Sequence, residues 1–320
     1  MRKILMRRWF LFVLSATLVA GIVGGPRLAD FAESIPRNVI IAAVLLAMAL
    51  PLRIDTMWGT LRRPGPALLG VAINLVLVPL LAYAASRLLV DDELAVGMII
   101  AAAVPCTLAS AAVWTRLAGG NDAVSLLVTM ITNLSCFLVT PAWVRLLAGR
   151  GDASVPFGDM VVKLFVLVVL PIIAAQLLRL IPAVGHWATA NKSGLSVFAQ
   201  LGILSIVFVG AVRCGQKLVE LDARLATIWG QVALMLVLVT VVHVAAWWFG
   251  YSMAAKLGMA RAEQLAVAFA GSQKTLMVGL AIALEFGGLA VLPMLAYHVL
   301  QLVIDTVLAD HCREAGQIKH

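Results

Sequence analysis

The sequence predicts an all-α polytopic membrane protein with ten transmembrane helices in two inverted five-helix repeats. Hydrophobic residues make up 62% of the 320 residues and charged residues only 12%, whereas a soluble domain carries about 25% charged residues. Apolar runs of about 20 residues, long enough to cross a bilayer, follow one another along the chain, and two of them carry matching interruptions. The composition excludes a soluble domain. The net charge of +8 is then explained by basic cytoplasmic loops rather than by nucleic acid.

Ten apolar runs define the expected helices. They lie near 8–24, 38–52, 66–88, 93–117, 122–148, 158–181, 194–212, 228–250, 262–284 and 287–308. The first follows a basic segment and resembles a signal peptide, but it lacks a convincing small-x-small cleavage site. We therefore expect it to remain as the first helix, so that residues 1–150 and 151–320 each form one five-helix repeat.

The fourth and ninth runs share an interruption near the middle. The letters VPCT break the fourth run at 104–107, and GSQK breaks the ninth at 271–274. Each half contains five spans, and because five is odd the two halves insert with opposite topology. Broken helices at matching positions of inverted repeats mark the midplane site of a secondary transporter, where free N–H groups attract anions and free carbonyls attract cations. The alternative, that Pro and Gly only kink ordinary helices, explains one helix better than a matched pair.

The basic residues predict the orientation. Loops on one side of the membrane carry more Lys and Arg than loops on the other, most clearly near the N-terminus. They include Arg2, Lys3, Arg7, Arg8, Arg62 and Arg63. By the positive-inside rule both termini are expected in the cytoplasm of a multi-pass protein of the bacterial cell inner membrane. The four cysteines form no CxxC pair, so neither a disulfide framework nor a zinc site is predicted.

Polar side chains inside the spans are candidate site residues. The fifth span carries a polar stripe at steps of three and four, which places it on one helix face. Its members are Asn121, Ser125, Thr129, Thr132, Asn133, Cys136 and Thr140. Hydroxyls often bond back to their own helix, whereas a buried amide such as Asn133 needs partners from other helices. Elsewhere stand Asn74, His243 and the line His298, Gln301 and Asp305. For His243 we favour a structural hydrogen bond between helices.

The broken runs and the polar span lie in motifs that resemble those of a known protein family. The stretch VPCTLASAAVWTRLAGGNDAVSLLVTMITNLSCFLVTP, together with GSQKTL in the ninth span, resembles the bile acid:sodium symporter family, in the branch of bacterial proteins and a vertebrate "member seven". The resemblance covers essentially the whole chain and implies ten helices in two inverted repeats. It also implies a core domain of helices 3–5 and 8–10, in which broken helices 4 and 9 cross, and a panel domain of helices 1, 2, 6 and 7. Substrate is then expected between core and panel.

The resemblance also implies an incomplete set of sodium ligands. The matching residues are Asn74, Ser125, Thr129 and Gln273. The family's Ser-Asn pair falls on Ala111 and Ala112, and its shared acidic residue falls near Phe269. Hard cations prefer charged oxygen ligands, so we expect one weak sodium site, centred on Ser125 and Thr129, instead of two-sodium coupling. No cofactor other than a sodium ion is expected.

Lys274 is the residue that most needs an explanation. A lysine at the centre of a hydrocarbon span costs about 2.5–3.5 kcal/mol on the insertion scale, and the position is too central for snorkelling to the interface. Three roles stay open: a built-in cation in the place of a sodium ion, a direct contact to an anionic substrate, and a proton carrier. If the charge is unpaired, Lys274→Met is expected to abolish transport and to leave a folded protein.

The sequence therefore predicts a secondary active transporter that moves a small organic anion by alternating access, coupled to sodium or to protons. The candidate substrate or coupling residues are Thr107, Ser110, Asn133, Ser272, Lys274, Thr275, His298 and Gln301. The alternative is a non-transporting membrane regulator or sensor that keeps the fold. No HExxH, GxSxG or P-loop motif is present, so an enzyme is not predicted. The lipid bilayer is the other expected partner, and the sequence leaves open whether the protein is a monomer or a homo-oligomer.

Overall fold

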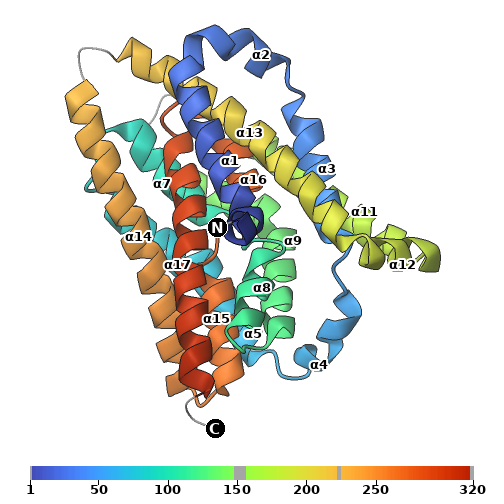
Figure 1. Ribbon diagram of the computed structural model, residues 1–320. Coiled ribbons are helices and arrows are strands. Elements are labelled where there is room, and N and C mark those ends of the chain that lie inside the picture. The colour runs from blue at the N-terminus through green and yellow to red at the C-terminus, as the bar shows by residue number, and fades with distance from the viewer. Residues whose placement is uncertain (1, 148–155, 222–224, 318–320) are drawn as a thin grey trace.

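The computed structural model describes residues 2–147, 156–221 and 225–317, and these residues form helices and loops without a strand (Figure 1). The helices are α1 (Arg2–Gly24), α2 (Ala29–Ser34), α3 (Arg37–Ala49), α4 (Trp58–Leu61), α5 (Gly65–Ala72), α6 (Val78–Ser86), α7 (Asp92–Ala103), α8 (Ser110–Leu117), α9 (Asp122–Leu147), α10 (Phe157–Leu164), α11 (Leu170–Arg179), α12 (Pro182–Ala190), α13 (Lys192–Glu220), α14 (Leu225–Lys256), α15 (Arg261–Ser272), α16 (Leu276–Ala283) and α17 (Val291–Gln317). The 3-10 turns are η1 (Gly25–Leu28) and η2 (Ile54–Met57), and the π-helical segments η3 (Ile73–Leu77) and η4 (Phe165–Val169) join α5 to α6 and α10 to α11. The predicted all-α class is confirmed.

Within the described residues, 8 helical segments are long and apolar enough to cross a membrane. They are Phe12–Ser34, Gly65–Ser86, Asp122–Leu147, Phe157–Arg179, Lys192–Glu220, Thr227–Lys256, Arg261–Ala283 and Val291–Ala315. The second expected span is the shorter α3, of 13 residues, and the fourth is divided into α7 and α8. The last helix begins at Val291 rather than at 287, since Gly287 has a φ of 139° that a helix cannot adopt. The expected boundary between the halves, at residue 150, lies outside the described residues.

The long helices pack in two groups. In the first group, α1 and α3 pack against α13, and the α10–α11 span packs against α3 through α11. The second group comprises α5 to α9 and α14 to α17; it is built around α15, which contacts α5, α8, α9 and α14. Figure 1 shows α3, α11 and α13 on one side of the molecule and α14, α15 and α17 on the other.

Small residues hold α1 close to α13. Gly21 and Gly25 lie on one face of the first chain segment, and Ala211 and Gly215 lie on one face of α13, because each pair is four residues apart. A Cβ added to Gly215 would lie 2.2 Å from the carbonyl oxygen of Ile22. Such small-x-x-x-small pairs let helix backbones touch inside a membrane. Backbone contact therefore fixes the first group.

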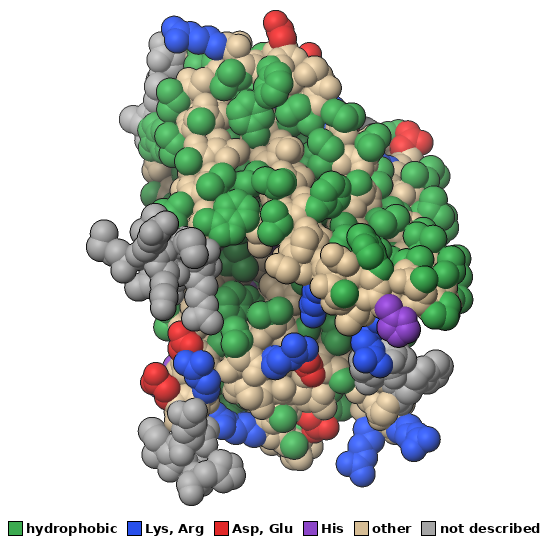
Figure 2. All heavy atoms as spheres, turned by 45° about the vertical axis from the view of Figure 1, so that its right-hand side comes forward, with side chains coloured by type: hydrophobic (Ala, Val, Ile, Leu, Met, Phe, Trp, Pro, Cys, Tyr) green, Lys and Arg blue, Asp and Glu red, His purple; other side chains and the backbone are tan. Residues whose placement is uncertain are grey.

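Burial distinguishes the interior helices from the lipid-facing ones. In the Arg261–Ala283 segment the whole apolar window is buried inside the protein, whereas only 17% of the window of Phe12–Ser34 is buried. Figure 2 shows hydrophobic side chains over the upper part of one face and Lys and Arg side chains gathered on its lower part, with a hollow between them. Such an apolar surface band is what a bilayer covers.

Candidate functional site

The first break separates α7 from α8. Helix α7 ends at Ala103, and residues 104–109 run without helical structure until α8 begins. Pro105 explains the break, because proline disfavours a helical conformation in the residue before it; Val104 is indeed extended, with φ −73° and ψ 159°. Helix α8 turns into α9 at Gly119, whose φ of 82° favours glycine. The predicted interruption at 104–107 is confirmed.

The second break separates α15 from α16 and meets the first. Gln273 and Thr275 are extended, with ψ values of 144° and 127°. The Thr275 N–H donates to the Pro105 carbonyl at 2.9 Å, which joins the two breaks. The predicted interruption is confirmed, although it lies two residues later than expected because Gly271 and Ser272 still belong to α15.

Side chains of α17 hold the second break extended. The Gln301 amide pairs with both backbone groups of Lys274: Oε1 accepts from the N–H at 2.9 Å and Nε2 donates to the carbonyl at 2.8 Å. The Tyr297 hydroxyl donates to the Ser272 carbonyl at 2.8 Å. His298 lies 3.2 Å from the Gln301 amide through Nδ1. Two members of the predicted His298, Gln301 and Asp305 line therefore meet at this break.

The polar stripe of α9 faces the first break. Its bonds are those of Thr140 to the Ala103 carbonyl (2.9 Å), Asn133 to the Cys106 carbonyl (2.8 Å) and Thr129 to the Thr107 carbonyl (3.2 Å). Thr132 Oγ1 accepts the Cys106 N–H at 3.3 Å. These bonds replace the ones that the broken helix lost. Nearer the start of α9, Ser125 pairs with the Thr115 hydroxyl at 2.7 Å and lies 3.4 Å from the Ala266 carbonyl.

Asn74 lies in the π-helical segment η3, and proline explains why carbonyls are available there. The Val78 N–H bonds to the Ile73 carbonyl, and Pro79 has no N–H to donate. The carbonyls of Asn74 and Leu75 therefore lack their usual helical donors. Trp143 Nε1 donates to the Leu75 carbonyl at 2.7 Å, which leaves the Asn74 carbonyl for a side chain.

Lys274 supplies that side chain. Its ammonium is fully buried and donates to the Asn74 carbonyl, to Asn74 Oδ1 at 3.2 Å and to the Val104 carbonyl at 3.0 Å. Among the described residues no carboxylate pairs with this charge, but its N–H groups all have oxygen acceptors. Lys274→Met would leave three oxygen atoms without a donor, and each buried unpaired group costs about 1–3 kcal/mol, so this variant is not expected to keep full stability.

The Asn74 amide also acts as a cap for α15. Its Nδ2 donates to the carbonyls of Ala270, Gly271 and Gln273, at 3.1, 3.2 and 2.9 Å. These carbonyls belong to the end of α15, where the helix leaves its last C=O groups unpaired. One buried side chain thus joins α5–α6, the end of α15 and Lys274.

Gln273 joins both breaks to a buried carboxylate that the resemblance did not imply. Its Oε1 accepts from Thr107 Oγ1 at 2.6 Å and from Ser110 Oγ at 3.0 Å, and its Nε2 donates to Asp305. The other Asp305 oxygen lies 3.0 Å from His243 Nε2. The interpretation of His243 as an interhelical hydrogen-bonding residue is confirmed. Its pairing with Asp305, 62 residues away, had no signal in the sequence.

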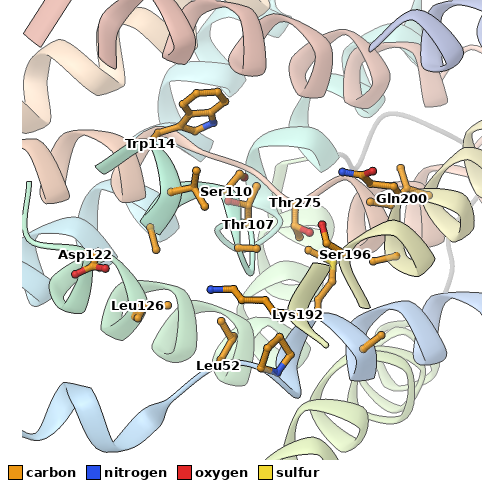
Figure 3. Close-up of a pocket in the computed structure, with 18 of the residues that line it drawn as sticks. Leu52, Thr107, Ser110, Trp114, Asp122, Leu126, Lys192, Ser196, Gln200 and Thr275 are labelled. Atoms are coloured by element: carbon orange, nitrogen blue, oxygen red, sulfur yellow. The ribbon is translucent and has the colours of Figure 1, made fainter. Parts of the chain in front are cut away.

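A cavity of about 590 Å³ lies between the two helix groups, beside the crossing. Four predicted residues line it: Thr107, Ser110, Thr275 and His298. Asn133, Ser272, Lys274 and Gln301 do not; they lie behind the cavity wall. From α13 come Lys192, Ser196 and Gln200, which the sequence analysis missed (Figure 3). Their spacing of four residues places them on one helix face, the same signal that identified the stripe of α9.

Two electrostatic features favour an anion in this cavity. Its charged lining residues are Arg53, Arg116, Lys192 and Asp122, of which only the last is acidic, and it pairs with Arg116. The residues that open α8 and α16, Ser110 and Leu276, also line the cavity. Helix N-termini carry partial positive charge and unpaired N–H groups.

Several polar contacts between the helix groups lie at the end away from the cavity. Arg213 donates to the Leu284 carbonyl at 3.0 Å, and Lys163 donates to the Ala281 carbonyl at 2.9 Å. The ion pairs here are Lys163 with Glu285 (2.7 Å) and Lys217 with Glu93 (3.6 Å). On α13 these residues follow the cavity-lining ones by ten or more positions, about 15 Å along the helix.

Comparisons with known proteins agree with a membrane transporter. The model of the SBF-like CPA transporter family matches residues 8–314. "Uncharacterized protein PA2026" of Pseudomonas aeruginosa is 31% identical over 261 residues, which are 76% of this chain and 74% of that protein. "Probable sodium/metabolite cotransporter BASS4, chloroplastic" of Oryza sativa subsp. indica is 26% identical over 287 residues, 86% of this chain and 68% of that protein. "Sodium/bile acid cotransporter 7" of Rattus norvegicus is 23% identical over 324 residues, 94% and 91% of the two chains.

Proposed function

This chain belongs to the SBF-like CPA transporter family, a family of transporters and not of enzymes, and we propose that it is a secondary active transporter of a small organic anion. Substrate binds in the cavity between the two helix groups, and relative movement of the groups exposes it to either side of the membrane in turn. The observation that carries this proposal is the convergence of two broken-helix N-termini on one cavity whose lining holds three basic side chains and one acidic one. Its volume lies within the range of about 300–1,000 Å³ that small-molecule sites occupy.

The proposal includes ten spanning segments in two inverted halves, in a bacterial inner membrane with both termini in the cytoplasm. The eight long apolar segments, α3 and the α7–α8 pair supply the ten. The inverted halves are supported by a correspondence of contacts: α9 follows the first break and bonds its backbone, and α17 follows the second and does the same. The first helix group then corresponds to a panel domain and the second to a core domain.

Measured uptake tests the proposal. Purified full-length protein in liposomes is expected to accumulate a labelled anion such as taurocholate, or another carboxylate or sulfate found by thermal shift, when an ion gradient is imposed. The same anions are offered as sodium and as choline salts, and at several values of pH, to identify the coupling ion. Binding of an anion without any uptake under all gradients would instead support the regulator or sensor.

Lys192→Ala tests the anion contact. Lys192 reaches the cavity from the start of α13 (Figure 3), and one charge contact near a protein surface is worth about 1 kcal/mol, a factor of about five. We therefore expect an about fivefold higher KM for the anion with a nearly unchanged thermal midpoint. Lys256→Ala, at the far end of α14, is the matched control. An unchanged KM in Lys192→Ala would contradict the charge contact.

Sodium coupling is proposed at the start of α9. There the hydroxyls of Ser125 and Thr129 lie beside the carbonyls of Ala266 and Thr107. Such neutral oxygens bind sodium weakly. Thr129→Ala is expected to reduce sodium-dependent stabilisation and uptake. Thr140→Ala is the matched control, because it removes an equivalent bond of the same stripe to Ala103 at a distance from the proposed ion. If both variants lost sodium-dependent uptake equally, the ion site would not lie at Thr129. If uptake followed pH and ignored sodium, the coupling ion would be the proton.

A further inference from the structure

Lys274 does not line the cavity, and its ammonium is fully buried. The charge therefore does not contact a molecule bound there. We propose that Lys274 is a tethered cation that permanently fills a monovalent-cation site made of neutral oxygens. The site is the oxygen cage formed by the carbonyl and Oδ1 of Asn74 and the carbonyl of Val104. The cage itself does not depend on the proposed transport function; only its consequence for transport, given below, rests on that proposal.

The cage is built to hold a cation. All three of its atoms are hydrogen-bond acceptors, and none belongs to a carboxylate. Two of them are available through the local backbone: Pro79 provides no N–H for the Asn74 carbonyl, and the break after α7 leaves the Val104 carbonyl without a helical donor. The Val104 carbonyl also lies at the C-terminal end of α7, where the helix dipole is negative. Emptied of its ammonium, the cage would hold three unpaired buried oxygens.

The ammonium fits this cage better than other side chains would. It carries three N–H donors on one compact atom, and three oxygens accept from it. A guanidinium is planar and larger, so it could not reach the same three atoms at once. The orientation of the cage is fixed as well, because Asn74 Nδ2 is occupied by the end of α15.

For transport, a cation that is part of the chain cannot be released to either side. The lysine side chain therefore occupies this position throughout the cycle, and uptake requires no external ion here. Any sodium requirement then arises from the neutral oxygens at the start of α9. Because Val104, Asn74 and Lys274 all belong to the second helix group, the cage moves as one piece with it.

Removing the side chain while leaving its space should restore an open cation site. Full-length Lys274→Ala in detergent is expected to have a thermal midpoint several degrees below that of the unmodified protein in choline chloride. Methylammonium chloride or sodium chloride at the same ionic strength should recover part of that loss, because these small cations can enter the cage and choline cannot. The unmodified protein should gain nothing from methylammonium over choline, and any gain it shows from sodium through the site at the start of α9 is the baseline that is subtracted.

Two further variants separate the cage from general salt effects. Lys274→Met fills the space without a charge, so it should lose stability and gain no more from small cations than the unmodified protein does. Lys163→Ala removes a lysine that bonds a helix carbonyl at the protein surface and should respond to the three salts as the unmodified protein does. Loss of stability in Lys274→Ala without selective recovery, or no loss at all, would overturn the proposal.

A folding failure also has a defined meaning. Lys274→Ser keeps a hydrogen-bond donor in the cage and leaves room for an ion, so it carries the same comparison if Lys274→Ala yields no folded protein. If neither folds, even when purified in methylammonium chloride, the proposal is overturned. These measurements need no substrate. If Lys274→Ala shows the selective recovery but the unmodified protein transports no anion, the proposal of the cation cage is supported and only the proposed transport function is contradicted.

Discussion

Asn74→Leu is expected to remove most of the folded protein. Leucine has the same number and branching of side-chain heavy atoms but cannot accept from Lys274 or donate to the end of α15. The variant therefore weakens the environment of a buried charge and leaves the carbonyls of Ala270, Gly271 and Gln273 without their cap. Each buried polar group left without its partner costs about 1–3 kcal/mol, and more where the group is charged. The yield of monodisperse protein and its thermal midpoint measure this effect.

The control is Asn191→Leu. Asn191 lies exposed between α12 and α13 and bonds only the Trp187 carbonyl of its own helix, so its replacement should change the thermal midpoint little. If Asn74→Leu were as stable as this control, Asn74 would not be the link between the two breaks and α5–α6.

Gly215→Leu is expected to separate α1 from α13. The new Cβ alone would lie 2.2 Å from the Ile22 carbonyl oxygen, a backbone atom that cannot move aside without shifting α1. Overpacking typically costs about 1–3 kcal/mol, and more where backbone must move. Because α13 also lines the cavity, we expect lower uptake per folded molecule together with a lower thermal midpoint.

Gly194 provides the matched comparison on the same helix. A Cβ added there meets no atom within 4 Å, so Gly194→Leu should leave the thermal midpoint unchanged. Similar midpoints for the two variants would show that the close contact between α1 and α13 contributes little to stability.

The sequence predicted what local chemistry determines. Proline disfavours a helical conformation in the residue before it, so Pro105 allowed the first interruption to be located to within a few residues. The stripe of α9 was visible because period and polarity are properties of one segment. The second break was less exact, since no proline marks it and side chains of α17 hold Lys274 extended.

Partners across long sequence distances could not be predicted. The stripe of α9 was visible in the sequence, but its partners were not: most of its hydrogen bonds go to the backbone of the first break. His243 and Asp305 meet only because α14 and α17 pack together. The acceptors of Lys274 could not be predicted because they are mostly carbonyls, which every residue has and which become available only where a helix is interrupted.

In the proposed cycle, the contacts at the end away from the cavity keep that side of the membrane sealed. Lys163, Arg213 and Lys217 join the two helix groups there, while the opposite end is hollowed by the cavity. In the proposed cycle these contacts act as a gate that must part before substrate can leave by that route. The two ion pairs are partly exposed and therefore weaken as ionic strength rises. The height of this barrier, and so the rate at which the carrier turns over, is then set in part by the salt concentration of the compartment that the gate faces.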